Sequence, residues 1–145
     1  SLYRYVENKM ALLRGVIEAT YKDLIATLYA AVRPEDEPRA QLIAVALAYR
    51  AFVHRNPVAY GLAYTTTITE LRTDPALLEA GVLPIQQIMA RLSGAANALP
   101  ALRGVWALIH GWSMLEVGQQ FRRGGDLDAS FVRAVEAYLD GWKAS

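Results

Sequence analysis

A histidine, a hydroxyl and a carboxylate follow one another at three-residue intervals late in the chain. His110, Ser113 and Glu116 would fall near one line along a helix, and they are the three kinds of group that a catalytic triad uses. A triad also needs backbone donors for the oxyanion, but the amides around a serine in mid-helix already donate within the helix. We therefore expect no catalysis from these residues and predict that the protein is not an enzyme.

Glu116 needs a partner, because it falls within the apolar arc of the same helix, near Ile109 and Ser113. An unpaired carboxylate in such surroundings is costly. Gln120 one turn further on, a group from a second subunit and a bound ligand are all candidate partners. His110 is expected to form a hydrogen bond in a pocket wall or a subunit interface, or to be an ordinary core histidine with a satisfied ring.

The residue types do not indicate a metal or cofactor site. The chain has two histidines and no cysteine, which excludes thiolate zinc sites and thiol catalysis and fits a reducing compartment. His54 lies between Arg50 and Arg55, and no spacing of histidine and carboxylate repeats. We predict no metal site and no cofactor.

A ligand pocket is indicated by the aromatic and thioether side chains of the middle segments. Aromatic rings with polar tips and flexible methionines line apolar pockets that have a few orienting hydrogen bonds. The alternative for each residue is ordinary core packing. The candidate pocket residues are Tyr49, Phe52, Tyr60, Tyr64, Met89, Trp106, His110 and Met114.

Helices must position these side chains, because proline and glycine divide the chain into segments of helical length and none alternates with period two. We predict an all-α multi-helix bundle. The expected helices cover residues 9–32, about 38–55, 57–64, a short turn from 75 that is interrupted at 81–84, about 83–98, from 100 to before 124, and a last segment that begins after Asp126 or Asp128 and carries Trp142.

The composition is apolar for a soluble chain of 145 residues, with 54% hydrophobic and 20% charged residues. A subunit interface or an internal cavity would account for this excess. The net charge of +1 gives no broad basic field that attracts nucleic acid or membrane. No signal peptide and no long uncharged apolar run is evident, so we expect a cytoplasmic protein without a membrane partner.

The segment 101–121 is apolar on every face of its helix, so it must be covered from more than one direction. A second subunit would supply that cover. Glycines recur every seven residues and would form a groove of bare backbone for a second helix, and the last helix would complete a four-helix dimer interface. The alternative is that the glycines fit the helix against its own neighbours. The predicted interface residues are Gly104, Gly111, Trp112, Leu115, Gly118, Phe131, Val135, Tyr138 and Trp142.

The first thirteen residues, SLYRYVENKMALL, are expected to form the end of one helix and the start of another. Leu2 to Val6 is a short amphipathic stretch, Glu7 and Asn8 form a break with Asn8 as N-cap, and Lys9 starts a long helix. A cation at a helix start is disfavoured by the helix dipole, and a phosphate would compensate for it. The alternative is a solvated Lys9.

This opening segment resembles the one that closes the helix-turn-helix of tetracycline-repressor (TetR) family regulators. Tyr5 stands where the family often has histidine, and Val6 where it often has phenylalanine. The resemblance implies that Tyr3, Tyr5 and Lys9 contact the DNA backbone in the intact protein. The alternative for the two tyrosines is packing between helices.

A second resemblance lies in the apolar helix. Trp106, His110 and Gly111, followed by Leu115 and Glu116, are similar to the signature of the WHG-type C-terminal regulatory domain of the same family. The two resemblances occur in the family's order along the chain.

Together they imply that residues 1–8 are a remnant of the DNA-binding domain, the end of its recognition helix, and that residues 9–145 form a ligand-binding and dimerisation domain. Two further helices would precede Ser1. The implied partners are a second copy of the chain, a small hydrophobic or aromatic effector, and operator DNA for the intact protein but not for this fragment. The alternative is a helical bundle that carries or acts on a small hydrophobic molecule.

Overall fold

The computed structural model describes residues 1–144 and is all-helical, which confirms the predicted fold class. No strand and no helix that is both long enough and apolar enough to cross a membrane occurs within these residues. The elements are α1 (Leu2–Ala31), α2 (Pro38–Arg55), α3 (Pro57–Thr65), the 3₁₀ helix η1 (Thr69–Leu71), α4 (Pro75–Ser93), the 3₁₀ helix η2 (Ala95–Asn97), α5 (Ala98–Val117) and α6 (Leu127–Trp142).

Prolines and aspartates set most of the helix starts. Pro38, Pro57 and Pro75 are the first residues of α2, α3 and α4, where the missing N–H would have no helical partner and the fixed φ is already suitable. Asp74 and Asp126 each accept a hydrogen bond at 3.0 Å from an amide in the first turn of α4 and α6. These starts agree with the prediction.

The break predicted at Glu7 and Asn8 is absent, because α1 runs without interruption from Leu2 to Ala31. An asparagine inside a helix costs only a fraction of 1 kcal/mol, and neither glycine nor proline lies near it. Ser1 caps the helix instead by accepting from the amide of Arg4. Lys9 therefore lies in the interior of a helix, and the expectation that a helix start there attracts phosphate is wrong.

The interruption predicted between Gly81 and Pro84 is also absent, since α4 is one helix from Pro75 to Ser93. Pro84 removes one helical hydrogen bond, at a cost of about 3 kcal/mol in an isolated helix. The buried side chains of Ile85 and Met89 hold the following turns in the core. Tertiary packing therefore outweighs the local preference for a break.

The apolar helix differs from the prediction at both ends. α5 begins at Ala98, two residues before Pro100, and ends at Val117. Gly118 caps it, and Gln119 adopts a left-handed backbone with φ 54°, so that the amide of the next residue bonds back to the last turn at 2.8 Å. The segment from 118 to 126 is a connection to α6, not an extension of the helix.

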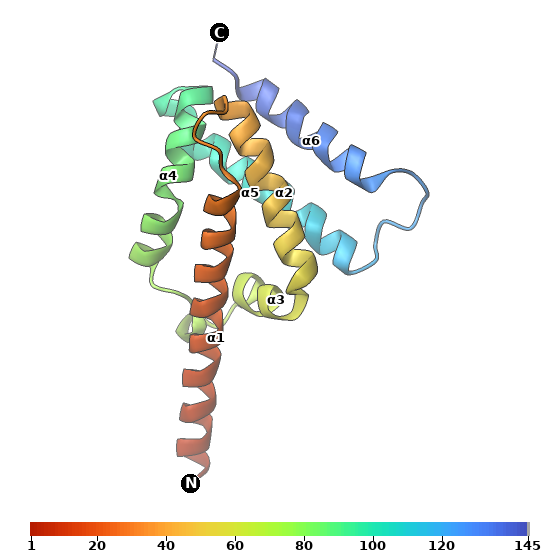
Figure 1. Ribbon diagram of the computed structural model, residues 1–145. Helices are drawn as coiled ribbons and strands as arrows, with labels where there is room; N and C mark the ends of the chain where they lie inside the picture. The colour runs from red at the N-terminus through yellow and green to blue at the C-terminus, as the bar shows by residue number, and fades with distance from the viewer. Residues whose placement is uncertain (145) are drawn as a thin grey trace.

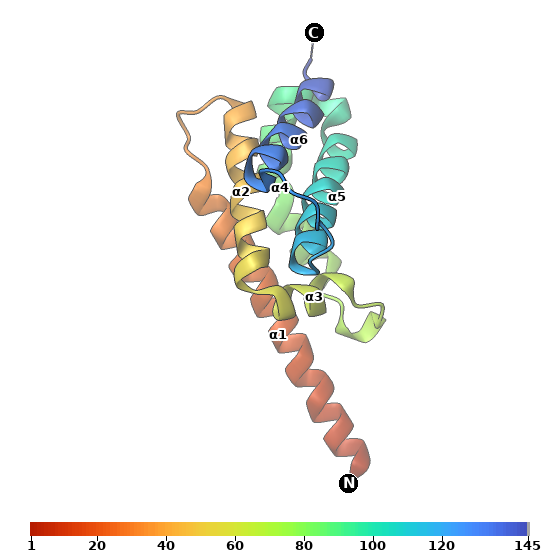
Figure 2. The same cartoon turned by 90° about the vertical axis from the view of Figure 1, so that its right-hand side faces the viewer.

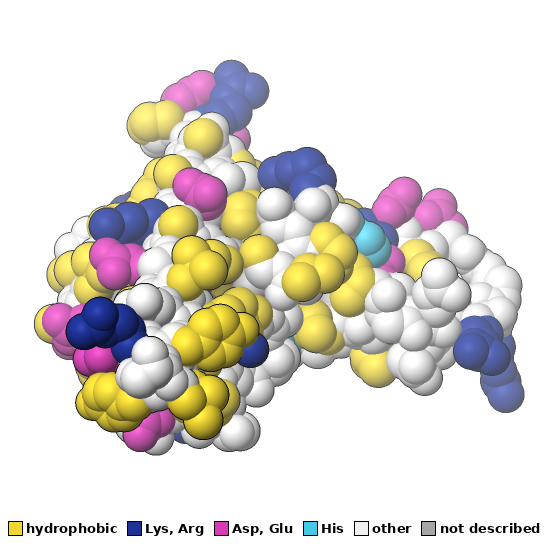
Figure 3. All heavy atoms as spheres, turned by 90° about the horizontal axis from the view of Figure 1, so that it is seen from below, with side chains coloured by type: hydrophobic (Ala, Val, Ile, Leu, Met, Phe, Trp, Pro, Cys, Tyr) yellow, Lys and Arg dark blue, Asp and Glu magenta, His cyan; other side chains and the backbone are white. Residues whose placement is uncertain are grey.

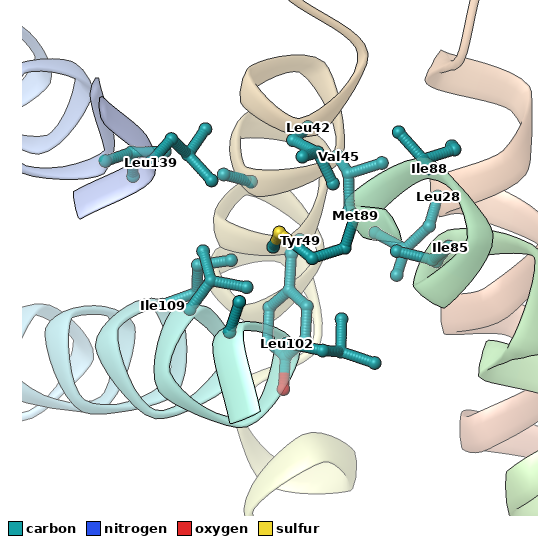
Figure 4. Packing of buried hydrophobic residues seen from close by; sticks show 14 of the residues in the cluster. Leu28, Leu42, Val45, Tyr49, Ile85, Ile88, Met89, Leu102, Ile109 and Leu139 are labelled. Atoms are coloured by element: carbon teal, nitrogen blue, oxygen red, sulfur yellow. The ribbon is translucent and has the colours of Figure 1, made fainter. Parts of the chain in front are cut away.

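The core lies where the helices converge around α2. Buried side chains from α2 meet side chains from α1, α4, α5 and α6 (Figure 4). The labelled core residues are Leu28, Leu42, Val45, Tyr49, Ile85, Ile88, Met89, Leu102, Ile109 and Leu139.

The N-terminal half of α1 extends beyond all the other helices, and the two ends of the chain lie at opposite ends of the molecule (Figures 1 and 2). Its apolar side chains are exposed, with Leu2 at 79% and Leu12 at 69%. Seen from this end, hydrophobic side chains lie on the surface among charged ones (Figure 3). The protruding half of α1 thus contributes little to the core of the bundle.

Candidate functional site

A chain of hydrogen bonds joins three helices in the interior. The hydroxyl oxygens of Tyr49 on α2 and Tyr60 on α3 lie 2.5 Å apart, and the Tyr60 hydroxyl lies 2.5 Å from Nδ1 of His110 on α5. Both tyrosines are fully buried. Trp106 packs edge-on against the Tyr49 ring at 5.2 Å, and Tyr64 stacks on the Tyr60 ring at 4.6 Å. The structure therefore brings five of the eight predicted pocket residues into contact.

The protonation of this chain follows from its burial. Burial lowers the pKa of His110, so the ring is neutral near pH 7. Burial also raises the pKa of Tyr60 to about 12, so the hydroxyl keeps its proton. Tyr49 then donates to the Tyr60 hydroxyl, and Tyr60 donates to Nδ1 of His110, so each hydroxyl donates one hydrogen bond. The Nε2–H of His110 is left as a further donor.

The other three predicted pocket residues lie elsewhere in the packing. Phe52 and Met89 are buried in the hydrophobic core, and Met114 is partly buried against it. Trp106, one of the five residues in contact, also lines a mostly apolar hollow of about 350 Å³ between α4 and α5.

A cavity of about 500 Å³ lies between α1, α3, η1 and the start of α4. Its volume is in the range of small-molecule sites. Tyr64 forms part of its wall, and because the same ring stacks on Tyr60, the cavity borders the buried hydrogen-bond chain. The cavity is lined by Ile17, Tyr21, Ala63, Tyr64, Thr66, Thr69, Arg72, Thr73, Asp74, Pro75 and Leu78.

The sequence analysis missed every residue of this wall except Tyr64. The predicted helices end at residue 64 and resume at residue 75, so the stretch from Thr65 to Asp74 carries no site prediction. A signal was present in the hydroxyl-rich composition of 65–73, but only the fold shows that α1 passes beside it. Elements distant in sequence build the cavity.

Two tyrosines of α1 attach this helix to α4 next to the cavity. The Tyr21 hydroxyl donates to the backbone oxygen of Leu78 at 2.8 Å, and Tyr29 donates to the backbone oxygen of Gly81. A Cβ atom at Gly81 would lie 3.0 Å from Cζ of Tyr21 and closer still to its hydroxyl. Glycine at this position therefore makes room for the Tyr21 contact.

Glu116 has the partner that its burial demands, and that partner is Arg50 of α2. The guanidinium forms two bonds to the carboxylate, at 2.6 and 2.7 Å, and His54 Nε2 lies 3.0 Å from the same carboxylate. The side chain of Glu116 is 5% exposed and that of Arg50 13%. Arg50 also pairs with Asp128 of α6 at 2.7 Å. The hydrogen bonds from Arg50 hold the pKa of Glu116 below its usual value.

The three groups at the triad spacing therefore do not bond to one another. His110 bonds to Tyr60, Glu116 pairs with Arg50, and the Ser113 hydroxyl is buried without a hydrogen-bond partner within residues 1–144. Gln120, one of the candidate partners of Glu116, donates instead to the backbone oxygen of Gly118 at 3.1 Å. Their alignment along α5 does not bring them together.

Several predicted interface residues contact their own chain. Phe131 and Val135 of α6 are completely buried in the core. Gly104 faces Tyr138, because a Cβ there would lie 2.7 Å from Cζ of that tyrosine, and the Tyr138 hydroxyl donates to the backbone oxygen of Ala101 at 2.8 Å. Gly104 thus allows α6 of the same chain to approach α5.

The remaining predicted interface residues have mixed surroundings. Trp112 packs against the rings of Phe121 and Phe131, and Trp142 is partly buried beside Tyr138. Leu115 is 43% exposed, and the space beside Gly111 is open. Gly118 caps α5. The three glycines therefore do not form one continuous groove, and the open part lies around Gly111 and Leu115.

The predicted DNA-contact residues lie on the protruding half of α1, and all three are exposed. Tyr5 and Lys9 are four residues apart and share one face of the helix. Tyr3 lies on another side, where it lines a shallow hollow with Met10 and Glu70.

A comparison with protein families gives a match over the middle and end of the chain. The family model described as tetracyclin repressor-like, C-terminal domain, matches residues 42–138, which is more than half of the chain. The matched range begins within α2 and ends within α6, so it includes Arg50, Tyr60, His110 and Glu116. No curated protein matches the chain significantly.

Proposed function

Because the chain belongs to the tetracyclin repressor-like C-terminal domain family, we propose that it is the effector-binding and dimerisation domain of a cytoplasmic DNA-binding transcriptional regulator. In this proposal a small hydrophobic or aromatic effector binds within the bundle, two copies pair through α5 and α6, and effector binding is coupled to release of DNA. The residues that precede α2 connect the domain to the DNA-binding part.

The observation that carries this proposal is the cavity between α1 and α4. One wall consists of Ile17 and Tyr21 of α1, and another of Leu78 at the start of α4. The Tyr21 hydroxyl bridges the two walls through its bond to the Leu78 carbonyl. A molecule that enters the cavity therefore contacts the helix that leads to the N-terminus, and it also contacts the group that fixes that helix in place.

The length of α1 converts a small movement at the cavity into a larger one at its tip. From Tyr21 to Leu2 the helix spans about 28 Å at 1.5 Å per residue. A tilt of about 5° at Tyr21 then moves the first turn by about 2.5 Å. In a dimer the two reading heads must match successive major grooves about 34 Å apart, so such a displacement lowers the affinity for DNA.

The surface proposed for dimerisation lies beside the contact between α5 and α6. Gly111 and Leu115 form an open, apolar part of α5. On α6, Ala134, Ala137 and Gly141 share one helix face, and Ala137 and Gly141 are exposed. Small side chains on both helices let a second copy approach closely and form a four-helix contact.

The protruding half of α1 supports the proposed DNA contacts in the intact protein. Tyr5 and Lys9 lie on one exposed face, where a hydroxyl and an ammonium can contact the same backbone phosphates. Tyr3 lies on a different side of the helix, so its contact would be made separately. Residues 1–144 present no further reading element, so we expect no sequence-specific DNA binding from them alone.

A thermal-shift screen of small apolar and amphipathic compounds tests the proposed effector site. Compounds that raise the melting temperature of the chain should have a much smaller effect on Leu78→Trp, whose larger side chain occupies part of the cavity beside Tyr21. They should keep their effect on Val58→Trp, since Val58 is an exposed residue of α3 outside the cavity wall. Shifts that persist undiminished in Leu78→Trp, or the absence of any shift across the screen, would contradict the proposal.

A further inference from the structure

The cavity between α1 and α4 contains an arginine whose charge is not neutralised by the protein. Arg72 is exposed, and its guanidinium makes no ion pair and no side-chain hydrogen bond within residues 1–144. It lies in the wall of the cavity, in the link between η1 and α4. A cation in this position is available to a ligand.

The carboxylate in the same wall is already engaged. Asp74 caps α4 and accepts from the amide of Ala76 at 3.0 Å. Its side chain lies at the N-terminus of a 19-residue helix, where the helix dipole is positive. Asp74 therefore compensates for the helix start and forms no ion pair with Arg72.

Several hydroxyl groups line the same cavity as Arg72. Thr69 and Thr73 flank Arg72 in the sequence and line the same cavity. Their hydroxyls, like that of Tyr64, have no hydrogen-bond partner in the described part of the chain. Burial raises the pKa of Tyr64, so this hydroxyl stays protonated and can donate. The segment from η1 to α4 thus offers one cation and several hydroxyl donors together.

The rest of the cavity is apolar. Ile17 of α1, Ala63 of α3, and Pro75 and Leu78 of α4 line it, together with the ring of Tyr21. Such a wall favours an apolar body, because burial of each apolar Å² contributes about 25 cal/mol. A neutral apolar molecule would fill this part and leave the guanidinium and hydroxyls without a partner.

We infer that the effector has an apolar body and one anionic group, such as a carboxylate or sulfonate, and that Arg72 selects the anionic group. This inference rests on the proposed function, in which the cavity is the effector site. An oxyanion can accept two bonds from a guanidinium and others from Thr69 or Thr73. The apolar body would then lie against Ile17 and Leu78, next to Tyr21.

Two fluorescent dyes with the same body test this selection. 8-Anilino-1-naphthalenesulfonate carries one sulfonate, and N-phenyl-1-naphthylamine lacks it. We expect the anionic dye to bind about tenfold more tightly, as for one charge-assisted contact of about 1.4 kcal/mol. Arg72→Gln should remove this advantage and leave the affinity for the neutral dye unchanged. Arg133→Gln, at an exposed position on α6, is the matched control and should alter neither affinity.

The outcomes separate this inference from the proposed function. If both dyes bind equally, or if Arg72→Gln weakens the binding of both to the same extent, Arg72 does not select an anionic group. The cavity would still be a ligand site. Loss of both dyes in Leu78→Trp would locate their binding in the cavity. If neither dye binds the unmodified chain, or if both bind Leu78→Trp unchanged, the cavity is not a ligand site and the proposed function fails with it.

Discussion

The hydroxyl of Tyr21 donates a hydrogen bond to the backbone oxygen of Leu78 at 2.8 Å. This bond joins α1 to α4 at the edge of the cavity that both residues line. The position of α1 relative to the bundle thus depends on a contact that a ligand in the cavity would touch. The proposed coupling between effector and DNA depends on this relationship.

Replacement of Gly81 by alanine tests how closely Tyr21 approaches α4. Alanine favours a helix over glycine by about 0.5 to 1 kcal/mol, and Gly15→Ala in α1, where the added Cβ meets nothing, should gain this amount. Gly81→Ala should show little or none of this gain, because Tyr21 must give up its bond to Leu78, at a cost of about 0.5 to 1.5 kcal/mol. Chemical denaturation of both variants measures the difference.

The Tyr21→Phe background provides the control for that comparison. Without the hydroxyl, the closest contact of the added Cβ is removed, so the penalty at Gly81 should shrink. Equal stabilisation by Gly81→Ala and Gly15→Ala in the unmodified chain would mean that the Tyr21 contact is not formed in solution.

The ion pair between Arg50 and Glu116 should contribute strongly to stability. Glu116→Gln leaves a mostly buried guanidinium without its main partner, and we expect a loss of about 2 to 4 kcal/mol in the free energy of unfolding. Glu18→Gln breaks an exposed pair with Lys22 at 3.0 Å and should cost less than about 0.5 kcal/mol. Similar losses in the two variants would refute the structural role of the buried pair.

Two pH ranges should be distinguishable in the stability of the chain. Burial lowers the folded-state pKa of His110 below its usual 6.5, so the unfolded chain takes up this proton first and stability falls as the pH drops below about 6.5. Hydrogen bonds from Arg50 lower the pKa of Glu116 below 4.5. Its contribution is complete above about pH 4.5 and is lost as the pH falls through the lower folded-state pKa.

Matched variants assign these two ranges. His110→Gln should reduce the fall in the free energy of unfolding between about pH 7 and 5. Glu116→Gln should reduce its fall below about pH 4.5. Urea denaturation at a series of pH values measures both. A decline below pH 6.5 that is unchanged in His110→Gln would show that His110 is not held neutral by the fold.

Sequence reasoning predicted the helices well where local chemistry decides them. The prolines that open α2, α3 and α4 and the Asp126 cap of α6 are local signals, and the structure bears them out. Pro84 misled the prediction because the cost of one missing hydrogen bond is local, whereas the packing that offsets it comes from other helices. Helix propensity alone does not contain that information.

The site was predictable only in part, for the same reason. The residue types of Tyr49, Tyr60 and His110 suggested a common pocket, and the fold joins them by hydrogen bonds. The partner of Glu116 lies 66 positions away at Arg50, which no periodicity within α5 indicates. Arg72 carried no sequence signal, because it matters only through the approach of α1 to the threonine-rich link.

Dimer formation can be tested at the open glycine of α5. Gly111→Leu adds bulk where the structure leaves empty space, so the isolated fold should be preserved while close approach of a second copy is blocked. Sedimentation velocity at micromolar concentration should show a dimer for the unmodified chain and for Gly15→Leu, and a monomer for Gly111→Leu. A chain that sediments as a monomer throughout would contradict the proposed interface.

The displacement of α1 on ligand binding is the most direct test of the proposed coupling. The chain has no cysteine, so Val6→Cys carries a single spin label near the tip of α1, and Lys143→Cys carries a control label just after α6. Pulsed electron resonance then measures the label-to-label distance in the dimer, with and without saturating 8-anilino-1-naphthalenesulfonate. A tilt of about 5° at Tyr21 moves Val6 by about 2 Å in each copy, so we predict a change of about 2 to 4 Å in the distance between the Val6 labels, and none at Lys143. An unchanged distance at Val6, with the dye bound in the cavity, would contradict the coupling.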